Sequence, residues 1–315
     1  MKHTVKVTLA LILFFFAAQF VGLLVVNNYI DHKKTAETKI ISYNPLPYKL
    51  ERPEVKNEST SWIYVTIAIL AGTVLILLLI RFNKPFVWRA WVFITIWLTL
   101  TISFSAFIKD YVAGILALTI SIIRFFRPNV IVQNASEIFI YGGLAAVFVP
   151  IMNLFSISIL LIVISVYDYI AVFKTKHMIQ MAEFQSKSNV FAGIMIPYDR
   201  GKIKIKERIK SVLKIRNSDN SQKPDSALNS GKSLAVIGGG DIGFTLLFAG
   251  VIMKGLMLKD PVLIGFLKAL IIPVFVTASL TLLLLKGRQN KFYPAMPFLS
   301  VGCFIGYAVV WLISG

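Results

Sequence analysis

The sequence predicts an all-α polytopic membrane protein with about nine transmembrane helices. Of its 315 residues, 57% are hydrophobic and only 15% are charged, whereas soluble domains carry about a quarter charged residues. The mean hydropathy is +0.74. Apolar runs of about twenty residues, the length that crosses a bilayer, recur from one end of the chain to the other.

The first apolar run covers residues 7–26 and follows Lys2, His3 and Lys6. It is long for the apolar part of a signal peptide and lacks a small-residue cleavage site, so we expect an uncleaved first span. Further runs lie at residues 62–80, 86–108, 111–126, 130–149, 151–173, 233–253, 261–285 and 297–313. The run at 111–126 is short for a bilayer.

The expected spans fall into two groups around one long polar loop. We expect residues 1–173 to form an N-terminal membrane bundle of about six spans and residues 233–315 a C-terminal bundle of about three. Residues 174–232 form a basic loop that contains DRGKIKIKERIK and then NSDNSQKPDSALNSGK. The second stretch has the composition of a disordered linker. We expect the loop to be a solvated connector that touches anionic lipid headgroups.

Basic residues predict the orientation in the membrane. With nine spans, one side receives Lys2, Lys6, Arg81, Lys84, Arg124, Arg127, the 174–232 loop, Lys286, Arg288 and Lys291. On the other side, acidic residues offset the lysines of the polar segment 31–61. An excess of basic residues marks the cytoplasmic side. We therefore expect an integral protein of the cell membrane, with the N-terminus in the cytoplasm and the C-terminus outside.

Charge and residue usage exclude several classes of function. The net charge is +18, but the basic residues lie in loops and at span ends and are not interleaved with aromatic residues, so we expect no nucleic-acid partner. Cys303 is the only cysteine, and His3, His32 and His177 are scattered along the chain. This pattern provides no disulfide framework and no zinc site, and we expect no metal or other cofactor.

Two acids, Asp168 and Asp241, lie within apolar runs. Asp168 precedes Lys174 by six residues and Asp241 follows Lys232 by nine, which places both about 9–13 Å from the same membrane border if the segments are helical. Two neighbouring carboxyls in a low dielectric share one negative charge. The charged one can take a proton from a water that attacks a peptide carbonyl, while the neutral one donates to the oxyanion. A third acid in an apolar run, Glu137, receives no role.

Glycines surround the second acid. Gly238, Gly239 and Gly240 directly precede Asp241. In a helix interior each glycine costs about 1 kcal/mol relative to alanine. Their presence suggests that another backbone, or a substrate, approaches closely at this position.

Three short motifs resemble those of the presenilin/signal peptide peptidase family. Tyr167-Asp168, GGGD at 238–241 and PAMP at 294–297 resemble its YD, GxGD and PAL motifs in order and spacing. Met296 stands where the family usually has leucine, a change that conserves volume. The segment KTKHM at 174–178 resembles archaeal members of the family.

The resemblance implies an intramembrane aspartyl protease of the GxGD type that cleaves transmembrane segments of membrane proteins, with Asp168 and Asp241 as the catalytic pair. It also implies that the neighbouring motif residues position the substrate, namely Tyr167, Gly238, Gly240, Pro294, Ala295 and Met296. The expected orientation matches presenilin, whereas signal peptide peptidases are inverted.

The main alternative is a proton-coupled membrane transporter, because paired acids within a membrane can also relay protons. Such a transporter is expected to have an internal repeat with broken helices in corresponding halves, and the sequence has no visible repeat. The expected partners are transmembrane peptides or membrane proteins as substrates and the lipid bilayer itself. The sequence leaves open whether the chain forms a homo-oligomer.

Overall fold

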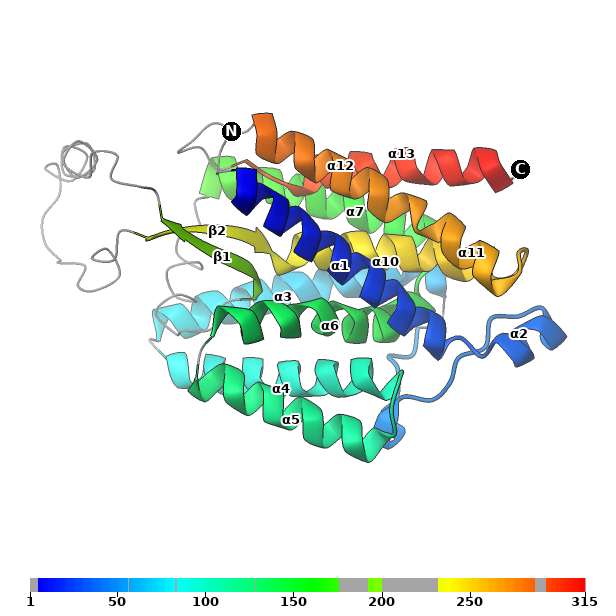
Figure 1. Ribbon diagram of the computed structural model, residues 1–315, viewed down its shortest axis with the longest axis horizontal. Coiled ribbons are helices and arrows are strands. Elements are labelled where there is room, and N and C mark those ends of the chain that lie inside the picture. Colours follow the sequence, from blue (N-terminus) through cyan, green and yellow to red (C-terminus); the bar gives the residue numbers. More distant parts are fainter. Residues whose placement is uncertain are drawn as a thin grey trace, which may run out of the picture.

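The computed structural model describes residues 5–55, 57–82, 84–127, 129–175, 192–199, 232–286 and 293–314. Most of these residues form long helices that run side by side (Figure 1). The helices are α1 Val5–Tyr29, α2 His32–Thr38, α3 Ser61–Arg81, α4 Pro85–Ser105, α5 Asp110–Phe126, α6 Val130–Phe148, α7 Leu154–Ile170, α10 Gly239–Leu256, α11 Val262–Ala269, α12 Ile271–Lys286 and α13 Met296–Ser314. The two strands are β1 Gly193–Asp199 and β2 Lys232–Gly238.

The expected membrane spans are confirmed as long apolar helices. Among the described residues, eight helical segments are long and apolar enough to cross a bilayer, and α11 with α12 counts as one of them. The run at 111–126 forms α5, which has 17 residues and is therefore about 25 Å long. It packs against α4 and α6. The prediction of about nine spans therefore holds, with α5 as the short one.

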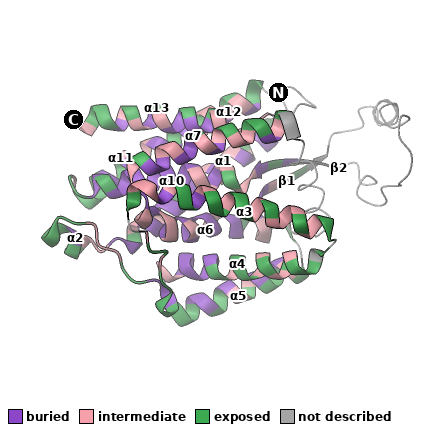
Figure 2. Ribbon diagram, turned by 180° about the vertical axis from the view of Figure 1, so that it is seen from behind, coloured by how far each residue is buried: buried purple, intermediate pink, exposed green. Residues whose placement is uncertain are grey.

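Helix α10 lies at the centre of the described bundle. It contacts α1, α6, α7, α12, α13 and both strands, and most of its residues are buried. Figure 2 shows buried residues concentrated along α1, α6 and α10, whereas α3 and α5 carry many exposed residues. Helices from the predicted N-terminal and C-terminal bundles thus share one core.

Small residues let the central helices approach closely. A Cβ added to Gly22 of α1 would lie 2.2 Å from Leu246 Cδ2 of α10. A Cβ added to Gly143 of α6 would lie 2.0 Å from the backbone oxygen of Thr99 in α4. Because lipid tails are as apolar as side chains, close packing of this kind is a main source of helix association in a bilayer.

A two-stranded sheet corrects the boundary predicted for the seventh span. The sequence predicted a helix from residue 233, but residues 232–238 form β2, and α10 begins only at Gly239. β2 pairs antiparallel with β1, from Gly193 opposite Gly238 to Asp199 opposite Lys232. The apolar, partly β-branched run LAVI favours a strand, and the glycines after it disfavour a helix until its first turn. The predicted all-α fold class is confirmed, but the sequence did not predict this pair of strands.

Part of the predicted basic loop forms the other strand. β1 lies at residues 193–199, inside the segment 174–232 that the sequence analysis treated as a connector. Residues 176–191 and 200–231, which include the end of KTKHM and the linker-like stretch, lie outside the described residues.

The polar segment after α1 is tied to the bundle by Arg52. Its guanidinium lies over the rings of Tyr29 and Tyr43, and its Nη2 donates a 2.9 Å hydrogen bond to the Asn44 carbonyl. Its Nε donates to the Ala146 carbonyl at the end of α6, at 3.3 Å. Burial lowers the pKa of Arg52 from its usual value, but these acceptors and rings compensate for lost hydration.

Candidate active site

Asp168 lies in the last turn of α7 and is partly exposed. The start of this helix is capped by the Asn153 side chain, which accepts a 2.9 Å hydrogen bond from the Ser156 amide. Near the other end, Ser165 Oγ lies 2.8 Å from Ser300 Oγ of α13. This contact fixes α7 against α13 one turn before Asp168.

The proline motif begins α13 directly beside Asp168. The Met296 amide donates a 3.1 Å hydrogen bond to Asp168 Oδ2. The Ala295 carbonyl accepts from two amides of the first helical turn, each at 3.1 Å, and Pro294 before it is buried. The motif thus aims a backbone donor at an acid that lies far away in the sequence.

Asp241 is the third residue of α10 and lies in its first turn. The residue before the helix, Gly238, has an extended backbone with φ −67° and ψ 147°. A Cβ added to Gly238 would lie 3.4 Å from Asp241 Oδ2, an ordinary contact distance. The start of a helix carries a partial positive charge, which stabilises a negative charge placed there.

A buried glutamine on α1 fixes the first turns of α10. Gln19 Nε2 donates to the Ile242 carbonyl at 2.9 Å and to Thr245 Oγ1 at 2.7 Å. Thr245 Oγ1 in turn donates to the Asp241 carbonyl at 2.8 Å. Gln19 is not among the site residues predicted from the sequence, although a polar residue in the middle of an apolar span is the same kind of signal as the two acids.

The structure brings the two acids together. Helices α7, α10 and α13 contact one another pairwise, and the carboxyls of Asp168 and Asp241 are close enough to interact electrostatically. The helical depth calculated for Asp241 was wrong, because seven residues of strand precede the helix. The two acids still interact electrostatically, because α10 packs directly against α7.

A close contact occurs at one of the three glycines, but a side chain makes it and not the backbone or substrate that the sequence suggested. A Cβ on Gly239 would lie 2.8 Å from the Tyr141 hydroxyl oxygen. A Cβ on Gly240 would make only ordinary contacts of 3.6 Å and more with Phe244. The interpretation of all three as helix-interior residues was wrong, because Gly238 precedes α10 and the other two open it.

Tyr167 and Glu137 have partners elsewhere in the bundle. The Tyr167 hydroxyl lies 3.4 Å from Thr73 Oγ1 of α3, which is a packing contact between α3 and α7. Glu137 is buried on α6 and pairs with Arg124. Arg124, one of the basic residues expected on the cytoplasmic side of the spans, lies in the last turn of α5 and is buried.

The site contains two carboxyls. Asp168 accepts a hydrogen bond from the Met296 backbone amide, and Asp241 lies in the first turn of α10. Among the described residues, no group of three or more His, Cys, Asp or Glu side chains could hold a metal ion. Two acids that interact electrostatically can divide the roles of acid and base in chemistry on a peptide carbonyl.

Two solved structures resemble the chain over nearly its whole length. A presenilin family intramembrane aspartate protease, solved in a C222 crystal, matches with a TM-score of 0.61 and 16% identity, covering 97% of this chain and 99% of that one. A presenilin family intramembrane aspartate protease in a P2 crystal matches with a TM-score of 0.57 and 17% identity, covering 97% of each chain. At these identities the likeness shows the fold. No curated protein sequence matches the chain significantly.

A family model supplies the identity. The model of the signal-peptide peptidase, presenilin aspartyl protease family matches residues 44–315, which is most of the chain. The transporter alternative finds no support in these comparisons. The chain therefore belongs to the signal peptide peptidase and presenilin family and is an integral membrane aspartyl protease whose substrates are membrane proteins within the bilayer.

Proposed function

We propose that Asp168 and Asp241 are the catalytic pair of this protease and that it hydrolyses peptide bonds inside transmembrane segments. The observation that carries the proposal is the meeting of two acids from α7 and α10, with the Met296 amide hydrogen-bonded to one of them. Ionisable residues within membrane helices are rare and tend to be functional.

The chemistry requires one carboxylate and one neutral carboxyl. The carboxylate takes a proton from a water molecule whose oxygen forms a bond to the peptide carbonyl carbon, while the neutral acid gives its proton to the carbonyl oxygen. The resulting tetrahedral intermediate then breaks its C–N bond. The amine leaves with one proton from the first acid, and the other acid regains its proton from the hydroxyl that becomes the new carboxyl group.

The backbone around the acids supports an extended substrate. A helical peptide bond is enclosed by its own hydrogen bonds, so a substrate helix must unwind before attack, and its freed amides need partners in the bilayer. The chain before α13 contains Pro294 and Pro297, which disfavour helix at the residues before them. Strand β2 runs directly into the turn that carries Asp241. We propose that the residues at 238–240 and 294–296 hold such an extended segment.

The decisive experiment uses purified protein in liposomes with a generic transmembrane peptide and maps the fragments by mass spectrometry. Asp168→Asn and Asp241→Asn should each remove nearly all cleavage while leaving the protein folded, because either change destroys the shared-proton state. Asp110→Asn, on the first turn of α5, is the matched control and should cleave normally.

Inhibitors sharpen the same test. Cleavage should persist in EDTA and in serine-directed reagents, and a peptide isostere with a hydroxyl in place of the scissile carbonyl should block it. Near-normal cleavage by either of the two Asn variants would contradict the catalytic assignment.

We also propose that the N-terminus faces the cytoplasm and the C-terminus the outside of the cell membrane. The basic loops support this orientation, and Figure 1 is consistent with it, since α1 begins at the end of the bundle near the hairpin and α13 ends at the other. Proteases added to intact cells should spare residues 175–232, and inverted vesicles should expose them. The reverse pattern would show that the protein has the opposite orientation in the membrane.

A further inference from the structure

Glu137 is a buried charge that the proposed reaction does not use. It lies in the first half of α6, within a membrane-spanning segment, and its side chain is 2% exposed. A buried charge in a membrane helix is costly unless it is paired and fully hydrogen-bonded. The hydrogen-bond partners of Glu137 therefore indicate its role.

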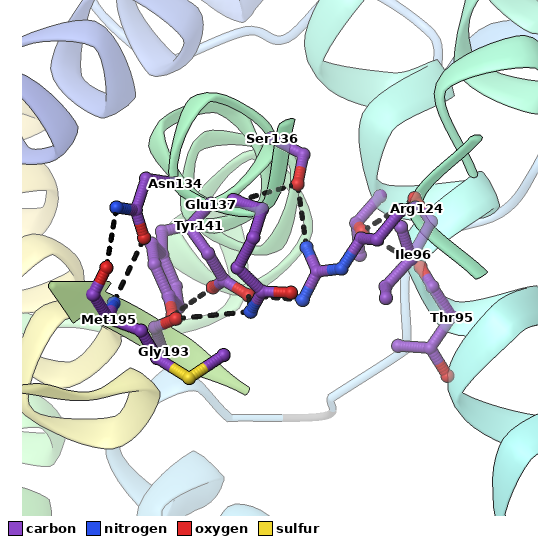
Figure 3. Close-up of polar contacts among 11 residues, drawn as sticks. Thr95, Ile96, Arg124, Asn134, Ser136, Glu137, Tyr141, Gly193 and Met195 are labelled. Atoms are coloured by element: carbon purple, nitrogen blue, oxygen red, sulfur yellow. Dashed lines mark hydrogen bonds and ion pairs between the residues drawn. The ribbon is translucent and has the colours of Figure 1, made fainter. Parts of the chain in front are cut away.

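One carboxyl oxygen of Glu137 holds α5 against α6. Arg124 Nη2 donates to Glu137 Oε1 at 2.5 Å, and Arg124 Nη1 donates to Ser136 Oγ at 2.7 Å (Figure 3). Both charged side chains are almost completely buried. These contacts alone are enough to join α5 to α6, so a second contact of Glu137 serves another purpose.

The other carboxyl oxygen holds a tyrosine that faces the start of α10. The Tyr141 hydroxyl donates a short hydrogen bond to Glu137 Oε2, one helical turn away (Figure 3). Tyr141 is 4% exposed, and its hydroxyl oxygen lies 2.8 Å from the position that a Cβ of Gly239 would occupy. Gly239 opens α10 two residues before Asp241, so the tyrosine rests on the backbone that carries this acid.

The same face of α6 also holds strand β1. The Asn134 side chain forms two hydrogen bonds with the Met195 backbone, accepting from its amide at 2.9 Å and donating to its carbonyl at 2.8 Å (Figure 3). Gln133 Nε2 donates to the Gly193 carbonyl at 3.3 Å. Gly193 is the partner of Gly238 in the sheet.

The contacts on β1 and on α10 converge on the same turn. The Gly239 amide donates to the Ala192 carbonyl at 3.2 Å, directly before β1. The turn between β2 and α10 is therefore held by β1 through the sheet and by Tyr141 through direct contact. Helix α6 therefore contacts this segment in two ways, through its hydrogen bonds to β1 and through Tyr141.

We propose that the polar face of α6, defined as Gln133, Asn134, Glu137 and Tyr141, is a positioning device that sets the location of Asp241. Glu137 is its centre, because its charge is balanced by Arg124 on one side and orients the Tyr141 hydroxyl on the other. These are positioning residues that act through the Gly239 backbone. The proposal rests on the catalytic role proposed for Asp241.

The first test removes only the tyrosine hydroxyl. Tyr141→Phe leaves the Arg124–Glu137 pair intact, and we expect kcat to fall about tenfold or more with little change in KM, since a displacement of about 1 Å at a reacting group lowers rates up to about a hundredfold. Tyr29→Phe is the matched control, because its hydroxyl is also buried and donates to the Ile102 carbonyl at 2.8 Å, at the far end of α1.

A second readout separates positioning from loss of folding. The hydroxyl isostere titrates the number of competent active sites and gives their affinity. In Tyr141→Phe the number of sites should equal that of the wild type, but each should bind the isostere more weakly, in proportion to the loss of kcat. A purely structural residue would reduce the number of sites and leave the affinity of the remaining sites unchanged.

The third test uses the close contact itself. Gly239→Ala places a Cβ against the Tyr141 hydroxyl and should lower kcat strongly. In the double variant Gly239→Ala/Tyr141→Phe the nearest obstructing atom is absent, and the closest remaining contacts are 3.3 Å to the ring and 3.4 Å to the Ala192 oxygen. We therefore expect Gly239→Ala to lower activity much less in the Tyr141→Phe background than in the wild type. Strong coupling between the two positions is the signature of direct contact.

The outcomes separate this inference from the proposed function. If Asp241→Asn retains cleavage, the catalytic assignment fails and the positioning proposal fails with it. If the Asp variants are inactive but Tyr141→Phe behaves like Tyr29→Phe, or the Gly239 and Tyr141 effects simply multiply, the catalytic assignment stands and the positioning proposal is overturned.

Discussion

Helices α3 and α10 differ in hydropathy and in burial, and the more apolar of the two is the less buried, opposite to what is usual in soluble proteins. The span containing α3 is the most apolar of the eight, yet no residue of its most apolar stretch is buried; the span formed by α10 is the least apolar and the most buried. α3 has only Ser61 and Val65 buried along its length. Of these two helices the more apolar one lies on the outside of the bundle, whereas α1, which is nearly as apolar, is 44% buried over its most apolar stretch.

The reason is that lipid, unlike water, does not drive apolar side chains inward. Helices in a membrane associate through close packing and polar contacts, which need small and polar residues. α10 contains Asp241, Thr245 and three glycines in its first half, counting Gly239, Gly240 and Gly243. The residues that lower its hydropathy thus include the acid proposed to be catalytic and the threonine that Gln19 of α1 contacts.

The largest expected effect of this difference is at the glycines. Gly143→Ala on α6 would place a Cβ 2.0 Å from the Thr99 backbone oxygen, and we expect it to destabilise the protein by about 3 kcal/mol or more, since backbone cannot yield easily. Gly72→Ala on α3 has nothing within 4 Å and should be neutral or slightly stabilising. Thermal unfolding in detergent micelles measures both, and equal losses would contradict the division between the buried helices, to which α6 and α10 belong, and the exposed α3.

Large side chains should show the same contrast. Phe248 of α10 is fully buried and packs edge-on against Phe304 and Tyr307 of α13. We expect Phe248→Ala to cost about 3 kcal/mol, through lost packing. Ile67→Ala on α3, where the side chain is 59% exposed, should cost less than about 0.5 kcal/mol. The same unfolding measurement applies, and a large loss at Ile67 would place α3 in the core.

Changes at the proline motif should affect turnover more than stability. If Pro294 holds the backbone beside Asp168, Pro294→Ala should lower kcat by up to about a hundredfold with little change in yield or melting temperature. If the proline only starts a helix, alanine is tolerated there. Full activity in this variant would remove the motif from the mechanism.

The smallest effect is expected at the position that departs from the family pattern. Met296 is buried and contributes its backbone amide to Asp168, so the side chain can change while the contact remains. Met296→Leu conserves volume, and kcat/KM should stay within about threefold of the wild type. A larger change would show that the side chain itself shapes the site.

Much of the fold was predictable because each membrane-spanning helix requires a long run of apolar residues in the sequence. The order of the spans and the acids within them follow from hydropathy and from the cost of burying charge. The motif residues at Asp168 and Met296 could be named from the sequence, and the structure places them in contact. The role of each in catalysis stays a prediction.

The hairpin and the network on α6 could not be predicted for physical reasons. β1 and β2 are stable only as a pair, and their pairing joins Gly193 to Gly238 across a long loop, which a local pattern does not encode. Arg124 lies near the end of an apolar run and so resembles an exposed residue at the border of a span, but its partner Glu137 lies on the next helix. The short distance between them is a property of helix packing.

The long sequence separations at the centre of the bundle have a consequence for biosynthesis. Asp168 receives its amide hydrogen bond from Met296, 128 positions further on, and Gln19 supports a carbonyl 223 positions away. Contacts so distant in the chain form late. Until α13 has packed against α7, Asp168 lacks this hydrogen bond. If Asp168 is catalytic, as proposed above, we expect the nascent chain to be unable to cleave the other helices of the membrane until then.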